Sequence, residues 1–179
     1  PAPVLAKAGV PSDLLRDPEN RISFDLLGDL MEEATTATGL PHIGAMVGMQ
    51  GGTSSLGLIG RLMATAPTLR EAMRDLTINQ VRYINGAVAY MATQDGVVLW
   101  GYTVQAPTLR GITAILGGAM GVGVALLAEI AGTRPEEVRL GHAAPADTRG
   151  YRRTFGVPVV FDADQTCLVL PRALLDTPL

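Results

Sequence analysis

The dipeptide Asp95-Gly96, between two β-rich segments, restricts the fold more than any other feature of this sequence. Residues 87–93 and 97–104 are rich in apolar, aromatic and β-branched side chains. Asp-Gly favours the two-residue turns that join antiparallel strands. The positions of the two strands around this turn define three cross-strand pairs: Met91 with Trp100, Ala89 with Tyr102, and Tyr90 with Gly101. In the last pair the tyrosine ring can cover the glycine, which has no side chain. The sequence therefore predicts an antiparallel hairpin of known register.

Helical signals lie on both sides of this hairpin. Ser23 is a suitable N-cap for a helix over 24–38. We expect its acidic side chains on the solvated face, namely Asp25, Asp29, Glu32 and Glu33. The motif Ala-Pro-Thr-Leu-Arg occurs at 66–70 and 106–110, and in each copy Pro and a Thr N-cap predict a long helix, over about 69–84 and 109–131. Shorter helices are predicted over residues 11–15, 41–49, 58–64, 147–155 and 173–175.

The C-terminal third predicts further strands. A strand is expected over 138–142, and a second hairpin over 159–161 and 166–170 with its turn at 162–164. Helices packed on a small mixed, partly antiparallel sheet make an α+β fold. A chain of 179 residues has the size of one such domain, so we expect residues 1–179 to form a single domain.

An uncharged segment, residues 111–128, is at the lower limit of about 18 apolar residues for a membrane span. Its five glycines dilute the hydrophobicity, and Arg110 and Glu129 flank it without a cationic bias. We therefore predict a buried core helix and no membrane contact. Its small residues would let another helix approach closely.

The charged and polar composition argues against several functions. A net charge of −3 offers no basic surface for nucleic acid. The single cysteine, Cys167, fits a reducing, cytoplasmic compartment. His42 and His142 lie 100 residues apart in sequence without a cysteine or obvious carboxylate partner, so we interpret both as structural and expect no metal site and no cofactor.

Catalytic motifs are incomplete. Ser54 and Ser55 lie in a glycine-rich loop, but neither completes the Gly-x-Ser-x-Gly pattern of a hydrolase. Residues 118–123 match a dinucleotide fingerprint poorly, because they fall inside a predicted helix. We expect no enzymatic activity, and a small serine hydrolase is the least favoured alternative.

One inward-facing stripe changes from apolar to polar. On the helix beginning at Leu69, the face that carries Leu76 continues as Asn79, Gln80 and Tyr83. Buried polar groups need partners, since each unpaired group costs about 1–3 kcal/mol. A small ligand could supply them, and so could neighbouring backbone or an adjacent subunit. Further candidates for lining a ligand pocket are Trp100, Tyr102, Arg61 and Arg110.

Several motifs resemble one family over nearly the whole chain. The most specific are the C-terminal segments 142–147, 151–161, 168–171 and 174–179, joined by segments 8–11, 14–18, 21–23 and 67–72. They resemble the AraC/XylS transcription regulators, in the branch with an arabinose-binding-like N-terminal domain.

The resemblance implies a bacterial ligand-sensing domain that binds a small-molecule effector and forms a homodimer. In such regulators a helix-turn-helix domain follows, so we expect DNA contact only through a C-terminal domain absent from this sequence. A ligand-free dimerisation module of the same kind of regulator is the alternative. The family label does not identify the ligand.

Overall fold

The structure, a computed structural model, describes residues 2–17, 20–106 and 109–179. In the described residues, helices and 3-10 turns (η) accompany one five-stranded sheet, which confirms the predicted α+β fold. In chain order the elements are α1 (Ala2–Lys7), η1 (Leu14–Arg16), α2 (Phe24–Thr38), α3 (Ile43–Gly48), η2 (Thr53–Leu56), α4 (Gly57–Ala64), α5 (Leu69–Asn79), η3 (Gln80–Arg82), β1 (Ala87–Gln94), β2 (Val97–Val104), α6 (Ile112–Ala131), β3 (Glu137–Arg139), α7 (Arg149–Phe155), β4 (Val159–Val160), β5 (Cys167–Pro171) and η4 (Arg172–Asp176).

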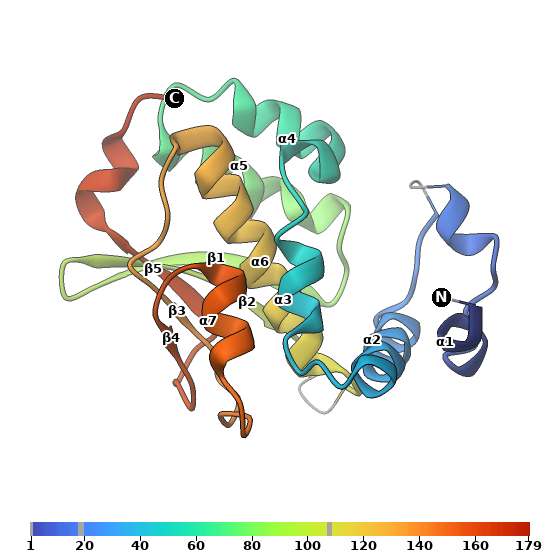
Figure 1. Cartoon of the computed structure of the whole chain (residues 1–179). Helices are drawn as coiled ribbons and strands as arrows, with labels where there is room; N and C mark the ends of the chain where they lie inside the picture. The colour runs from blue at the N-terminus through green and yellow to red at the C-terminus, as the bar shows by residue number, and fades with distance from the viewer. Residues whose placement is uncertain (1, 18–19, 107–108) are drawn as a thin grey trace.

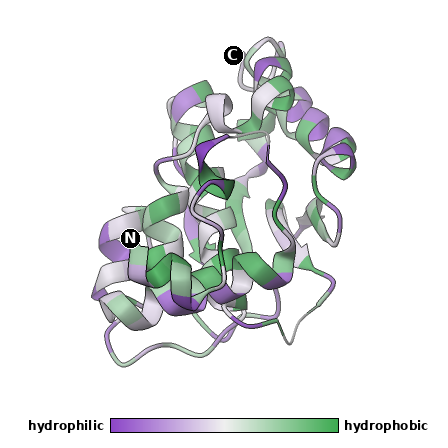
Figure 2. Ribbon diagram, turned by 90° about the vertical axis from the view of Figure 1, so that its right-hand side faces the viewer, coloured by the Kyte–Doolittle hydropathy of each residue, from purple (hydrophilic) through white to green (hydrophobic). Residues whose placement is uncertain are grey.

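The sheet lies at one end of the molecule and the N-terminal helices lie at the other (Figure 1). Helices α3 and α6 lie between these two parts, and α6 also contacts β2 and β5. The strands in the middle of the domain are mainly apolar in Figure 2, whereas the peripheral helices alternate apolar and polar residues. The C-terminus returns to the start of α5, where Thr68 and Pro178 form an isolated β-bridge.

The first hairpin has the predicted register. Strands β1 and β2 pair antiparallel, with Met91 opposite Trp100 and Ala89 opposite Tyr102. Tyr90 lies opposite Gly101, and a Cβ on that glycine would overlap the Tyr90 ring. The hairpin prediction is therefore confirmed, including the reason for the glycine.

The second predicted hairpin is wrong. The strand order is β1-β2-β5-β3-β4, so β3 separates β4 from β5. Strand β4 pairs in parallel with β3, and β5 pairs antiparallel with both β3 and β2. The backbone of Leu140 explains this arrangement, because its N–H donates to the Val160 carbonyl at 2.8 Å and its carbonyl accepts from Ala163 at 3.2 Å. The segment after β3 thus occupies the hydrogen-bonding positions that a hairpin partner would need.

The long helices match the predictions in place but not in every boundary. Helix α2 spans the predicted 24–38, and the Ser23 hydroxyl accepts the Leu26 N–H at 3.2 Å. Helix α5 ends at Asn79 instead of residue 84, because the Gln80 side chain bonds to β1 and the backbone tightens into η3. Helix α6 begins at Ile112 instead of 109, after Gly111 in the left-handed conformation. The predicted Thr108 cap lies outside the described residues.

The shorter predicted elements differ mainly at their ends. The helices predicted over 41–49 and 58–64 are α3 and α4, and those predicted over 11–15 and 173–175 are the 3-10 turns η1 and η4. Helix α7 begins at Arg149, two residues after the predicted Asp147, whose carboxylate still accepts the Arg149 N–H at 2.9 Å. Strand β3 ends at Arg139 instead of 142. Helix α1 was not predicted.

Glycines bring α6 and α3 into backbone contact. A Cβ on Gly44 or Gly48 would overlap backbone atoms of Ala114 or Gly118, and one on Gly121 would lie 2.6 Å from the Ala45 carbonyl oxygen. By length and mean hydropathy, 1.9, α6 could cross a membrane, but half of its most apolar window is buried inside the domain. The close helix packing that was predicted from these glycines is therefore observed, and α6 is packed as a core helix.

This packing predicts opposite effects of one substitution at two positions of α6. Gly121→Ala should lower the free energy of unfolding by about 1–3 kcal/mol, because the added methyl group overlaps the α3 backbone. Gly117→Ala should be neutral or stabilising by up to about 1 kcal/mol, since its Cβ would lie at an ordinary 3.5 Å from the Ala45 nitrogen and alanine favours the helix. Urea unfolding measures both, and equal effects would contradict the close contact.

Candidate functional site

The side-chain amide of Gln80 is satisfied by neighbouring backbone. Gln80 is 2% exposed. Its Nε2 donates to the carbonyls of Thr77 at 3.0 Å and Ala89 at 2.6 Å, and its Oε1 accepts the Ala89 N–H at 2.5 Å. The amide therefore occupies the outer edge of β1 at Ala89, as a neighbouring strand would. Of the three partners considered for the polar stripe, namely a ligand, neighbouring backbone and an adjacent subunit, neighbouring backbone is the one that bonds to Gln80.

The other residues of the predicted site lie apart from one another. Asn79 donates to the Asp75 carbonyl within its own helix at 2.9 Å, and Tyr83 is 48% exposed after η3. Trp100 is buried in the main core, and Arg61 is exposed on α4. Arg110 is exposed and binds the Asp29 carboxylate at 2.8 Å. No described pocket contains these five residues or Gln80, and the role of all six in ligand binding stays a prediction.

Tyr102 differs from these six residues, because it lines a pocket of about 600 Å³. We call this the hairpin pocket. It lies where β2 continues beyond Cys167, the first residue of β5, next to the beginning of α6. Its lining combines apolar and polar side chains from five parts of the chain: Tyr90, Tyr102, Thr103, Val104, Ile112, Thr113, Leu116, Gly141, His142, Ala163, Asp164, Gln165 and Thr166.

The Tyr102 hydroxyl is available to a ligand. It forms no hydrogen bond within the described parts of the chain, and the side chain is only partly buried. Burial of the ring raises the pKa of Tyr102 to about 12. The phenol is therefore protonated near neutral pH and can both donate and accept a hydrogen bond.

The loop 162–166 forms one wall of the pocket and is held on both sides. The Asp162 N–H donates to the His142 carbonyl at 3.0 Å, and the Thr166 hydroxyl accepts the Gly141 N–H at 3.0 Å. The Tyr90 hydroxyl donates to Gln165 at 2.8 Å. Sequence reasoning missed this wall because it assigned the loop to a hairpin turn. Its polar run, Asp162-Ala163-Asp164-Gln165, was the available signal.

The pocket also touches a cluster of aromatic rings. Tyr151 of α7 lies with ring centroids 5.7 Å from His42, 5.9 Å from His142 and 5.3 Å from Phe161. Its hydroxyl donates to the Pro41 carbonyl at 2.6 Å. One nitrogen of each histidine is buried without a hydrogen-bond partner in the described structure. Both histidine rings, partly buried, pack against Tyr151.

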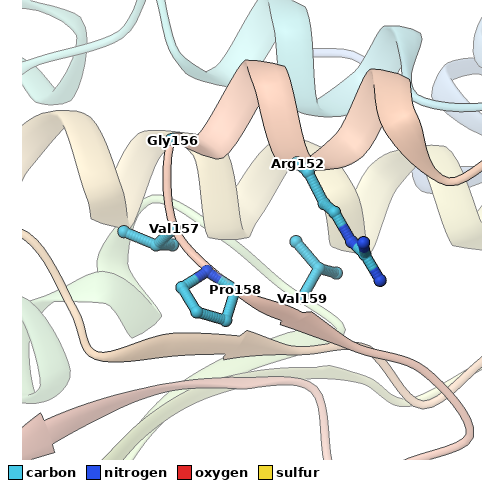
Figure 3. A pocket seen from close by; sticks show the side chains of 5 residues that line it. All are labelled: Arg152, Gly156, Val157, Pro158 and Val159. Atoms are coloured by element: carbon cyan, nitrogen blue, oxygen red, sulfur yellow. The ribbon is translucent and has the colours of Figure 1, made fainter.

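A second, more open hollow lies at the C-terminal end of α7. It measures about 510 Å³ and is lined by Arg152, Gly156, Val157, Pro158 and Val159 (Figure 3). Arg152 is its only side chain with polar atoms, and in the close-up it reaches down beside Val159. A small-molecule site typically has several convergent polar groups on an apolar wall. The hairpin pocket therefore fits a ligand better than this hollow does.

Comparison with known proteins identifies a family whose model matches the whole chain. The family described as the arabinose-binding domain of AraC transcription regulators, N-terminal, matches residues 1–179. No curated protein matches the sequence. A crystal structure of the transcriptional regulator CdpR from Pseudomonas aeruginosa has a similar fold, with a TM-score of 0.68 and 20% sequence identity. The alignment covers 99% of this chain and 55% of CdpR, so the chain spans about half the length of that regulator.

The environment of Gln80 generates a stability prediction. Gln80→Ala should lower the free energy of unfolding by about 2–4 kcal/mol, because it leaves the buried Ala89 N–H and carbonyl without partners. The matched control is Asn79→Ala, whose amide bonds only within its own helix, and its effect should stay within about 0.5 kcal/mol. Denaturant unfolding of the two variants checks this difference. An unchanged stability of Gln80→Ala would mean that water replaces the amide.

Proposed function

Because the chain belongs to the family of arabinose-binding N-terminal domains of AraC transcription regulators, we propose that it senses a small-molecule effector for such a regulator. We place the effector in the hairpin pocket. The observation that supports this site is its lining: the free hydroxyl of Tyr102 lies in one cavity of about 600 Å³ with the apolar side chains of Ile112 and Leu116.

The position of the pocket suggests how binding is transmitted. Its walls come from β1, β2, the first turns of α6, the segment after β3 and the loop 162–166. An effector in contact with all five would favour the state in which they are held together. His142 belongs to the pocket and also touches Tyr151, which is bonded to Pro41 ahead of α3. We therefore expect effector binding to shift the packing of the aromatic cluster formed by Tyr151, His42, His142 and Phe161.

The serine hydrolase alternative has little support. Ser55 is engaged in a local turn, where its hydroxyl donates to the Gly52 carbonyl at 2.7 Å and accepts the Gly52 N–H at 3.1 Å. Neither Ser54 nor Ser55 lines either of the two pockets. The family consists of transcription regulators, which favours binding over catalysis. In the whole regulator we assign DNA contact to another domain, and we propose that this domain acts in the cytoplasm.

Blocking the pocket tests the effector site. In the parent, a binding effector at one hundred times its Kd should stabilise the fold by about 2.7 kcal/mol, or about 5–10 °C in Tm. Thr113→Phe should abolish this shift, because Thr113 is exposed on α6 and lines the pocket. Ala128→Phe is the matched control, since it adds the same ring at an exposed α6 position outside the pocket.

The measurement is a thermal-shift screen of small metabolites that includes L-arabinose, amines, carboxylic acids and neutral alcohols. Stabilisation that survives equally in both phenylalanine variants would move the effector away from the hairpin pocket. Stabilisation lost only in Thr113→Phe would support the site.

A second candidate function, dimerisation, is favoured by exposed apolar side chains around η3. Ile78 is 56% exposed and Val81 is 60% exposed, next to the half-exposed ring of Tyr83. Adjacent exposed apolar residues are typical of protein–protein contacts. We propose this surface, residues 78–83, as the subunit contact of a homodimer.

Changing the charge of this surface tests the dimer. The double variant Ile78→Asp and Val81→Asp should shift the chain from dimer to monomer in sedimentation equilibrium, because the contact would then bury unpaired carboxylates. Leu15→Asp is the control, since Leu15 is comparably exposed, at 56%, in the N-terminal part of the chain. A parent chain that is monomeric at every concentration, or a double variant that dimerises like the parent, would contradict the proposal.

A further inference from the structure

We propose that the hairpin pocket selects an effector that carries a positively charged amine on an apolar body. This inference rests on the proposed effector site and goes beyond it by naming the chemical class of ligand. Three features of the described lining carry it: its charge, the way its acidic group is held, and its apolar wall.

The charge of the lining is negative. Asp164 is the one side chain in the lining with a full charge, and neither lysine nor arginine contributes to the described walls. A carboxylate or phosphate group in this pocket would meet repulsion without a cationic partner, whereas an ammonium group would find an opposite charge.

The Asp164 side chain has no hydrogen-bond or ion-pair partner among the described residues, although its neighbours in the loop have hydrogen-bond partners. Across the described residues it makes no hydrogen bond or ion pair, whereas Asp162, Ala163, Gln165 and Thr166 are each held by a hydrogen bond. The carboxylate therefore projects from an anchored loop, and binding would require little reordering of the backbone. Such preorganisation lowers the entropic cost of holding a ligand.

His142 does not reverse this charge preference. Its Nδ1 lies 2.9 Å from the Ala143 carbonyl, an acceptor, so Nδ1 carries the proton and donates it. In the neutral ring Nε2 is then unprotonated, and it is buried away from solvent. Neither ring nitrogen is therefore free to donate a hydrogen bond to an anion in the pocket.

The rest of the lining fits a hydrocarbon body. Val104, Ile112 and Leu116 supply aliphatic surface from the end of β2 and the first turns of α6. The Tyr102 hydroxyl, which is free to accept, offers a second oxygen to an N–H donor. An amine joined to an aliphatic or aromatic group would satisfy both walls at once.

Three probes with the same hydrocarbon skeleton test the inference: cyclohexylmethylamine, cyclohexylmethanol and cyclohexanecarboxylate. Titration of the ¹⁵N-labelled chain at low salt should show shifts at the pocket residues, and the amine should bind about tenfold more tightly than the carboxylate, with the alcohol between them. Asp164→Asn should remove most of this preference. Asp162→Asn, which removes the same charge from the same loop outside the lining, should retain it. Raising the salt should weaken the amine preference.

The outcomes separate the ligand class from the site. If the alcohol or carboxylate binds as tightly as the amine, and Thr113→Phe blocks that binding, the amine class is wrong and the pocket stands as the effector site. An amine preference unchanged by Asp164→Asn would also overturn the inference. If none of the probes shifts the pocket residues, or if Thr113→Phe leaves their binding unchanged, both the ligand class and the proposed site are overturned.

Discussion

The backbone contact between α3 and α6 is the constraint on which the arrangement of the domain depends. Gly44, Gly48 and Gly121 lack the Cβ atoms that would separate the two helices. With α3 this close, α6 lies between the N-terminal helices and the sheet, and Gly123 brings it against Leu168 and Trp100. Because close-packed interiors tolerate little added volume, these small residues determine how near the helices stand to the strands.

The hairpin pocket follows from the same arrangement. Strand β5 pairs with β2 only as far as Gly101, so the last residues of β2 extend beyond it. Helix α6 begins beside that end of β2, and the loop 162–166 closes the remaining side through its hydrogen bonds to Gly141 and His142. The cavity is thus built by elements far apart in the sequence, as is usual for a ligand site with apolar walls and few polar groups.

The C-terminal segments that resemble the family, residues 142–147 and 151–161, contribute part of the scaffold and one residue that lines the hairpin pocket. Tyr151 and Phe155 of α7 are buried side by side, and Tyr151 contacts both histidines and the Pro41 carbonyl. His142 is the member of this cluster that also reaches the pocket. Family membership therefore agrees with a regulatory role for the fold, while the chemistry of the effector depends on the residues that line the cavity.

The sequence by itself determined the first hairpin, the positions of the long helices and the family. The Asp95-Gly96 turn established the hairpin register, Ser23 marked the start of α2, and the α6 glycines indicated a close helix contact, because each signal acts over a few residues. Only the tertiary structure decided the partners of β4 and the use of the polar side chains. Gln80 and Asp164 illustrate the reason. The Gln80 amide bonds to the edge of β1, whereas Asp164 lines the hairpin pocket, and no local pattern encodes which long-range neighbours each side chain meets.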